Sequence, residues 1–154
     1  MECAASMNKS PVRVYAHRFA FPPEAEDENH HVNNVEYVRM LQEAAIAHTW
    51  QNGWAPEELH GRGWTWVVRS HFIEYHQPCQ AGEEIALHTW VADFHRIRSR
   101  RKYRFVRVAD GAVLADARTE WVFLDFRTGR PIAIPPEIRA AYAVVPEEEE
   151  RTIQ

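Results

Sequence analysis

Residues 27–34, with the sequence Asp-Glu-Asn-His-His-Val-Asn-Asn, gather the side chains of this chain that are best suited to acyl chemistry. The carboxylate of Asp27 is able to attack an acyl carbonyl or to take a proton from water. Asn29 and His31 offer an amide and an imidazole that would position the water or the carbonyl. We therefore treat Asp27, Asn29 and His31 as candidate catalytic residues. A polar loop that only braces the next helix is the simpler alternative.

A long helix is expected directly after this cluster, over about residues 34–50. Asn33 is a favourable N-cap, and Glu36 stands in the capping-box position three residues later. The first N–H groups of a helix have no partner within it, so those near Asn34 and Val35 would hold a developing oxyanion. A set of apolar or bulky residues recurs every three or four positions, as on one face of a helix, and Asn52-Gly53 ends the pattern. That set is Tyr37, Val38, Leu41, Ala44, Ala45 and His48.

The rest of the chain is typical of antiparallel strands. Asp110-Gly111 between two alternating runs predicts a hairpin, and Pro135-Pro136 begins a short helix that ends near Tyr142. One strand, one long helix and then four strands predict an α+β layer architecture. The expected strands cover residues 12–21, 64–75, 84–94, 98–108 and 113–126.

The length of 154 residues favours a single domain. We expect this domain at residues 11–145, between a flexible N-terminus at residues 1–10 and an acidic flexible tail at residues 146–154. The tail contains four consecutive glutamates, residues 147–150.

Composition and charge narrow the classes of partner. The formal net charge of -4 gives no reason to expect nucleic-acid binding. Cys3 and Cys79 do not form a disulfide framework, which favours a reducing compartment. Since the chain also lacks an apolar run long enough for a membrane span and a signal-peptide pattern, we expect a cytoplasmic protein without a membrane partner.

Metal and thiol chemistry are not expected either. No spaced His and Cys cluster resembles a zinc site, and His71 and His76 would point to opposite faces of a strand. We expect no metal and no cofactor. Cys79 has no helix end or cation placed beside it by the sequence, so we interpret it as a structural residue.

Asp27, the segment His31-Val32-Asn33-Asn34 and Tyr37 together resemble the motif of hotdog-fold thioesterases. In that motif an Asp is followed by a short loop, Val-Asn-Asn, two variable residues and a Tyr. The form Asp27-x-Asn29-x-His31-Val32-Asn33-Asn34 is most similar to plant-type acyl-carrier-protein (ACP) thioesterases and their bacterial acyl-CoA relatives. Many small hotdog hydrolases have Gly where His30 stands. Looser similarity covers residues 73–75, 78–82, 119–122 and 128–131.

The resemblance implies a curled antiparallel sheet wrapped around one long central helix, assembled as a homodimer or homotetramer. It implies hydrolysis of acyl-CoA or acyl-ACP thioesters in fatty acid metabolism, with Asp27 as nucleophile or general base. Many members carry an acid where Glu43 stands, so Glu43 joins the candidate catalytic residues, from its own helix or from the partner subunit. Asn33, Asn34, Val35 and Tyr37 are the candidate substrate-binding residues around the helix start.

A basic stretch supplies a second candidate substrate contact. On a strand, Arg98, Arg100, Lys102 and Arg104 share one face, whereas Ser99, Arg101, Tyr103 and Phe105 share the other. Basic side chains here would bind the phosphates of CoA or the acidic surface of a carrier protein. The residues selected for this role are Arg98, Arg100 and Arg101. An ordinary solvated face is the alternative.

Two other functions stay open at this point. Hotdog hydratases and dehydratases resemble Asp-x-Asn-Pro-x-His, whereas here His31 follows Asn29 after one residue and no Pro intervenes. A non-catalytic acyl-CoA-binding protein would keep the fold without the chemistry, although the presence of Asp27 argues against it.

Overall fold

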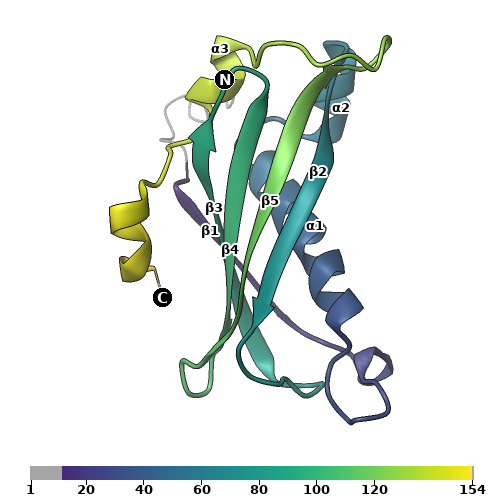
Figure 1. Ribbon diagram of the computed structural model, residues 1–154, viewed down its shortest axis with the longest axis vertical. Coiled ribbons are helices and arrows are strands. Elements are labelled where there is room, and N and C mark those ends of the chain that lie inside the picture. Colours follow the sequence, from purple (N-terminus) through teal and green to yellow (C-terminus); the bar gives the residue numbers. More distant parts are fainter. Residues whose placement is uncertain (1–11, 154) are drawn as a thin grey trace, which may run out of the picture.

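The computed structural model describes residues 12–153 and contains one five-stranded antiparallel sheet, with the long helix α1 on one of its faces (Figure 1). The strands follow the order β1-β3-β4-β5-β2 across the sheet. Their bounds are β1 Val14–Ala20, β2 Trp64–Tyr75, β3 Glu84–Phe94, β4 Arg98–Arg107 and β5 Val113–Asp125. The helices are α1 Asn34–Gln51, α2 Pro56–Gly61 and α3 Pro136–Ala140, with 3-10 turns η2 Pro23–Ala25 and η3 Glu147–Thr152. The expected α+β architecture is confirmed.

The main core lies between α1 and the inner face of the sheet. The residues of α1 that are buried recur at helical spacing and include Leu41 and Ala44, which are fully buried. Leu87 of β3 pairs in register with Phe105 of β4, and Phe105 pairs with Ala115 of β5, so apolar side chains form a row across the sheet beneath the helix. Burial of this row against α1 is the main force that fixes the helix on the sheet.

The alternation expected for β4 is also confirmed. Ser99, Arg101, Tyr103 and Phe105 are buried on the inner face, and the residues between them lie on the outer face. The basic stretch is therefore divided, because Arg101 points to the side of the sheet opposite to Arg98 and Arg100.

The acidic C-terminal segment differs from the expectation of a flexible tail. It forms η3 against the outer face of the sheet, where Lys102 pairs with Glu150 at 2.7 Å. Arg104 Nη1 donates to the carbonyl of Ile153 at 2.9 Å, and Ile153 packs with Trp90 and Val145. A run of glutamates indicates a solvated segment, but the cations that bind it come from a distant strand.

Other differences are local. The first strand stops at Ala20 because Pro22-Pro23 opens a 3-10 turn, and the short helix α2 was not expected. The expectation for residues 1–10 falls outside the described part of the chain. Between residues 12 and 153, no helix is long and apolar enough to span a bilayer.

Candidate active site

The loop before α1 closes on itself around Asp27. The Asp27 N–H donates to the carbonyl of His31 at 2.8 Å, and the His30 N–H donates to the carbonyl of Asp27 at 3.0 Å. Asp27 Oδ1 accepts the N–H of Asn29 at 2.9 Å. Within residues 12–153, Oδ2 accepts no hydrogen bond and pairs with no cation, so this oxygen of a half-buried carboxylate is available for an acyl carbonyl or a water.

The loop is anchored to the connection between β2 and β3. The Val32 N–H donates to the carbonyl of Cys79 at 2.8 Å, and the Ala81 N–H donates to Glu26 Oε2 at 2.9 Å. Sequence reasoning did not select Glu26, because nothing in an acidic loop indicates which acid meets a chain segment more than fifty residues away. These bonds hold Asp27 at a fixed place relative to the sheet.

His30 is the one described non-glycine residue with a positive φ, at 60°. An L-residue with a side chain is disfavoured in this left-handed region, whereas glycine adopts it freely. This explains physically why Gly suits this position in the motif that the loop resembles. The loop is closed in spite of this cost.

We therefore expect His30→Gly to leave the loop intact and to change the free energy of unfolding by no more than about 1 kcal/mol, on the stabilising side. The gain from relieved strain exceeds the entropy that an added glycine gives the unfolded chain. The matched control is His31→Gly, which relieves no strain and is expected to destabilise. Urea titration followed by tryptophan fluorescence measures both. A His30→Gly variant that is the less stable of the two would contradict this explanation.

Within residues 12–153, the N-terminus of α1 leaves one backbone donor next to the loop without an acceptor. Asn33 caps the helix as expected, and its Oδ1 accepts the N–H of Val35 at 3.0 Å. The reciprocal half of the capping box is not formed, because Glu36 pairs with Arg39 at 3.3 Å. Of the two N–H groups considered for an oxyanion, that of Val35 is thus occupied by the cap, and that of Asn34 meets no acceptor within residues 12–153.

Two tyrosines, Tyr37 and Tyr75, pack at the start of α1 and fix it against the sheet. Tyr37 is only 2% exposed, and its ring lies 5.1 Å from that of Tyr75 and 5.0 Å from that of Phe105. The Tyr75 hydroxyl donates to the carbonyl of Asn34 at 3.1 Å. Burial raises the pKa of Tyr37 far above its usual value, so the phenol stays protonated. In this arrangement Tyr37 is a packing residue, and Tyr75, which sequence reasoning passed over, ties the end of β2 to the helix.

Cys79 lies buried beside Tyr37 in the β2–β3 connection. Burial, with a smaller contribution from Glu83, raises the pKa of its thiol to about 11. A nucleophilic cysteine needs the opposite shift, so the thiol fits the structural role expected for it.

Glu43 is exposed on α1, nine residues after Asn34. At about 1.5 Å per residue it lies roughly 14 Å along the helix axis from that N-terminus. Within one chain, the structure does not bring Glu43 to the Asp27 loop.

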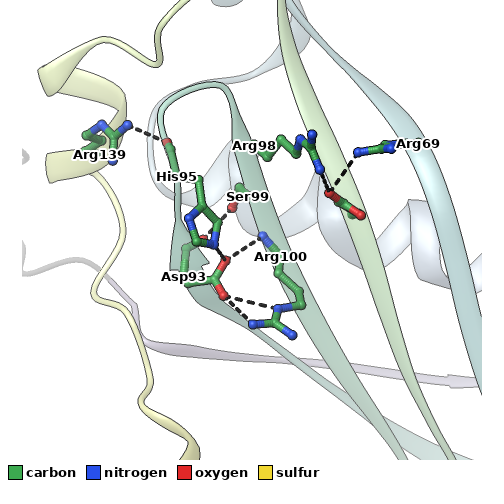
Figure 2. Close-up of polar contacts among 8 residues, drawn as sticks. Arg69, Asp93, His95, Arg98, Ser99, Arg100 and Arg139 are labelled. Carbon is green, nitrogen blue, oxygen red and sulfur yellow. Dashed lines mark hydrogen bonds and ion pairs between the residues drawn. The ribbon is translucent and has the colours of Figure 1, made fainter.

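Arg98 and Arg100 lie on the outer face of the sheet in the ion-pair network of Figure 2. Arg100 binds Asp93 through Nη2 at 2.7 Å and through Nε at 3.1 Å, and Arg98 Nη1 binds Glu120 at 2.9 Å. These pairs are partly exposed, and such pairs contribute little net stability. A phosphate is therefore able to compete for these two arginines, whereas Arg101 is buried on the other face.

In the part of the chain that the structure describes, no three His, Cys, Asp or Glu residues are placed to hold a metal ion.

Comparison with known proteins places this geometry in context. A model of the family described as "Thioesterase-like superfamily" matches residues 21–142. The chain is 28% identical over 108 residues to the chloroplastic palmitoyl-acyl carrier protein thioesterase of Cuphea hookeriana, a match that covers 66% of this chain and 26% of that protein. The chain thus spans about a quarter of the length of this curated relative.

Solved structures resemble the whole fold at low identity. A putative oleoyl thioesterase from Lactobacillus plantarum superimposes with a TM-score of 0.80 at 19% identity, covering 92% of this chain and 55% of that chain. The DHNA-CoA thioesterase from Staphylococcus aureus gives 0.77 at 18% identity, covering 84% of this chain and 89% of that chain. The protein SAV2348 from Staphylococcus aureus, solved in complex with CoA, gives 0.80 at 14% identity, covering 96% and 97%. The hotdog fold expected from the sequence is thereby confirmed.

Proposed function

Since the chain belongs to the thioesterase-like superfamily, we propose that it hydrolyses acyl thioesters of CoA or of acyl carrier protein to a free acid and a thiol. The observation that carries this proposal is that one carboxylate oxygen and one backbone N–H, both near the start of α1, have no hydrogen-bond partner within residues 12–153. These groups are Asp27 Oδ2 and the Asn34 N–H, and they flank the same helix start.

The two groups fit the two demands of thioester hydrolysis. The Asn34 N–H, at the positive end of α1, would stabilise the negative charge that develops on the carbonyl oxygen. Asp27 would take a proton from water as the water oxygen attacks the carbonyl carbon, or would attack that carbon itself to give an anhydride that water then opens. In both routes the C–S bond breaks, and the thiolate takes a proton from water or from the protonated base.

Asn29 and His31 are proposed to orient the attacking water or the carbonyl. Both side chains are exposed, and the backbone of Asn29 is fixed by its bond to Asp27. Arg98 and Arg100 are proposed as contacts for the phosphates of the substrate. A cytoplasmic location, the absence of a nucleic-acid partner and a place in fatty acid metabolism stay predictions from sequence and resemblance.

A thiol-release assay with a chromogenic thiol reagent, run over aliphatic and aromatic acyl-CoAs and acyl-ACPs, tests the proposal. Release of thiol with at least one substrate is expected. Loss of the conjugated absorbance of an enoyl-CoA without thiol release would identify a hydratase instead. Tight acyl-CoA binding with no release from any CoA or ACP ester would identify a non-catalytic binder.

We further propose that the protein is a homodimer or a homotetramer. β2 is an edge strand of the sheet, and it exposes Val67, Val68, Phe72 and Tyr75. Natural proteins rarely leave a long apolar edge uncovered, because it pairs with other chains. A second copy is the partner that would also bring an acid such as Glu43 toward the Asp27 loop.

Light scattering is expected to give two or four times the chain mass of 18.0 kDa. Val68→Lys places a charge at the exposed edge, and we expect it to weaken assembly about 10-fold or more. The matched control is Val144→Lys, which alters an equally exposed valine outside β2 and should leave assembly unchanged. A monomeric wild-type protein, or equal effects of both variants, would contradict the β2 interface.

A further inference from the structure

A cavity of about 210 Å³ lies between α1, α2 and the inner face of the sheet. It touches α1 from Gln42 to Thr49, and Gln42 is about 12 Å along the helix axis from the helix start at Asn34. The exposed residues of its lining, including Ile46 and His60, lie on α1 and α2, so the cavity opens between these helices. Its lining contains no Asp and no Glu.

One cation lines this cavity and is only 5% exposed. Arg101 Nη1 donates to His48 Nδ1 at 2.9 Å and to Thr89 Oγ1 at 3.1 Å. Its Nε and Nη2 groups meet no acceptor within residues 12–153, and no carboxylate of these residues pairs with it. By contrast, Arg98, Arg100, Lys102 and Arg104 on the outer face of the same strand are all paired.

His48 holds the guanidinium in place without neutralising it. Burial and the charge of Arg101 hold the pKa of His48 at about 4, so the ring is neutral. Its Nε2 donates to the carbonyl of Val12 at 2.8 Å, which leaves Nδ1 as the acceptor for Arg101. The ring of Tyr142 packs edge-on against His48. Burying a cation without an anion is costly, so the arrangement favours a ligand that supplies the negative charge.

We propose that this cavity binds the carboxylate of a small acid with an apolar body. Nε–H and Nη2–H of Arg101 lie on one side of the guanidinium, from which they can donate two parallel hydrogen bonds to the oxygens of a carboxylate. Trp66, Phe94 and Trp121 line the rest of the cavity and suit an aromatic or branched body. The carboxylate belongs either to a free acid or to the far end of an acyl chain, and the chemistry of recognition is the same.

Isothermal titration calorimetry of the full chain with benzoate and 3-phenylpropanoate tests the site, with benzamide as the neutral analogue. We expect both acids to bind, and benzamide to bind about 10-fold more weakly or not at all. Arg101→Met keeps the length of the side chain and should weaken acid binding about 30-fold or more. Arg118→Met, which alters an exposed arginine of the neighbouring strand, should not affect it.

A thermal melt without ligand separates a binding role from a structural one. If Arg101 serves a ligand, Arg101→Met melts at or above the wild-type temperature, because an uncompensated buried charge has been removed. The proposal is overturned if the protein binds neither the free acids nor an acyl chain that ends in a carboxylate. It is also overturned if benzamide binds as well as benzoate, or if Arg101→Met binds the acids as tightly as the wild type.

A second experiment, which rests on the proposed hydrolysis, decides whether the carboxylate belongs to a free acid or to the end of an acyl chain. Thiol release is compared between adipyl-CoA and hexanoyl-CoA. A lower KM for adipyl-CoA that disappears in Arg101→Met assigns the carboxylate to the acyl chain, and equal KM values with binding of free acids assign it to a free acid. If no thioester is hydrolysed, the proposed function fails, and calorimetry with the free acids still decides the carboxylate site.

Discussion

Asp27→Asn is expected to lower the rate of thiol release by about 10²- to 10⁴-fold, the usual contribution of a positioned acid or base. The substitution keeps the size of the side chain and an oxygen that accepts the Asn29 N–H, so the loop keeps its shape. It removes the negative charge on Oδ2, which both routes to hydrolysis need. A continuous thiol assay and a urea titration measure the activity and the fold separately.

Glu28→Gln is the matched control, because it removes the charge of the exposed acid next in the chain. We expect its turnover to stay within a few-fold of the wild-type value. Turnover of Asp27→Asn in that same range would exclude Asp27 from the mechanism.

Tyr37→Ala is expected to lower the free energy of unfolding by about 3–5 kcal/mol, the usual cost of deleting a large buried ring. The ring fills the space between the helix start and the rings of Tyr75 and Phe105, so its loss leaves a cavity beneath the Asp27 loop. Thiol release should fall as well, because the Asn34 N–H loses its fixed position.

Tyr37→Phe separates packing from a direct contact with substrate. It keeps the ring, and we expect a change in stability within about 1 kcal/mol and turnover close to that of the wild type. A Tyr37→Phe variant that is fully stable and inactive would restore the substrate contact expected for Tyr37 from the sequence.

The elements were predicted well wherever a local rule determines them. The bounds expected for residues 64–75 and 84–94 coincide with β2 and β3. Gly63 and Pro78 lie on either side of β2, and Gly82 stands just before β3. α1 begins at Asn34 as expected, because Asn33 caps it. The short helix α2 has only one buried residue, Leu59, and such a weak apolar pattern predicts no helix.

The candidate site was predictable only in part. The Asp27 loop follows from the spacing of its motif. The environment of Arg101 does not follow from the sequence, because its partners His48 and Thr89 come from α1 and β3 rather than from its own strand. Strand alternation placed Arg101 on the inner face, but only tertiary packing shows that no anion within residues 12–153 pairs with this buried cation. Glu26 and Tyr75 escaped selection for the same reason, since their bonds join segments far apart in the chain.

The most direct test of thioester hydrolysis measures both products in one sample. Benzoyl-CoA, octanoyl-CoA and palmitoyl-CoA, with the matching acyl-ACPs, are incubated with the full chain, thiol is followed with the chromogenic reagent, and the free acid is measured by chromatography. We predict that at least one substrate yields thiol and free acid in equal amounts, at a rate that Asp27→Asn lowers at least about 100-fold. Neither product from any thioester, or hydrolysis that Asp27→Asn leaves unchanged, would contradict the account.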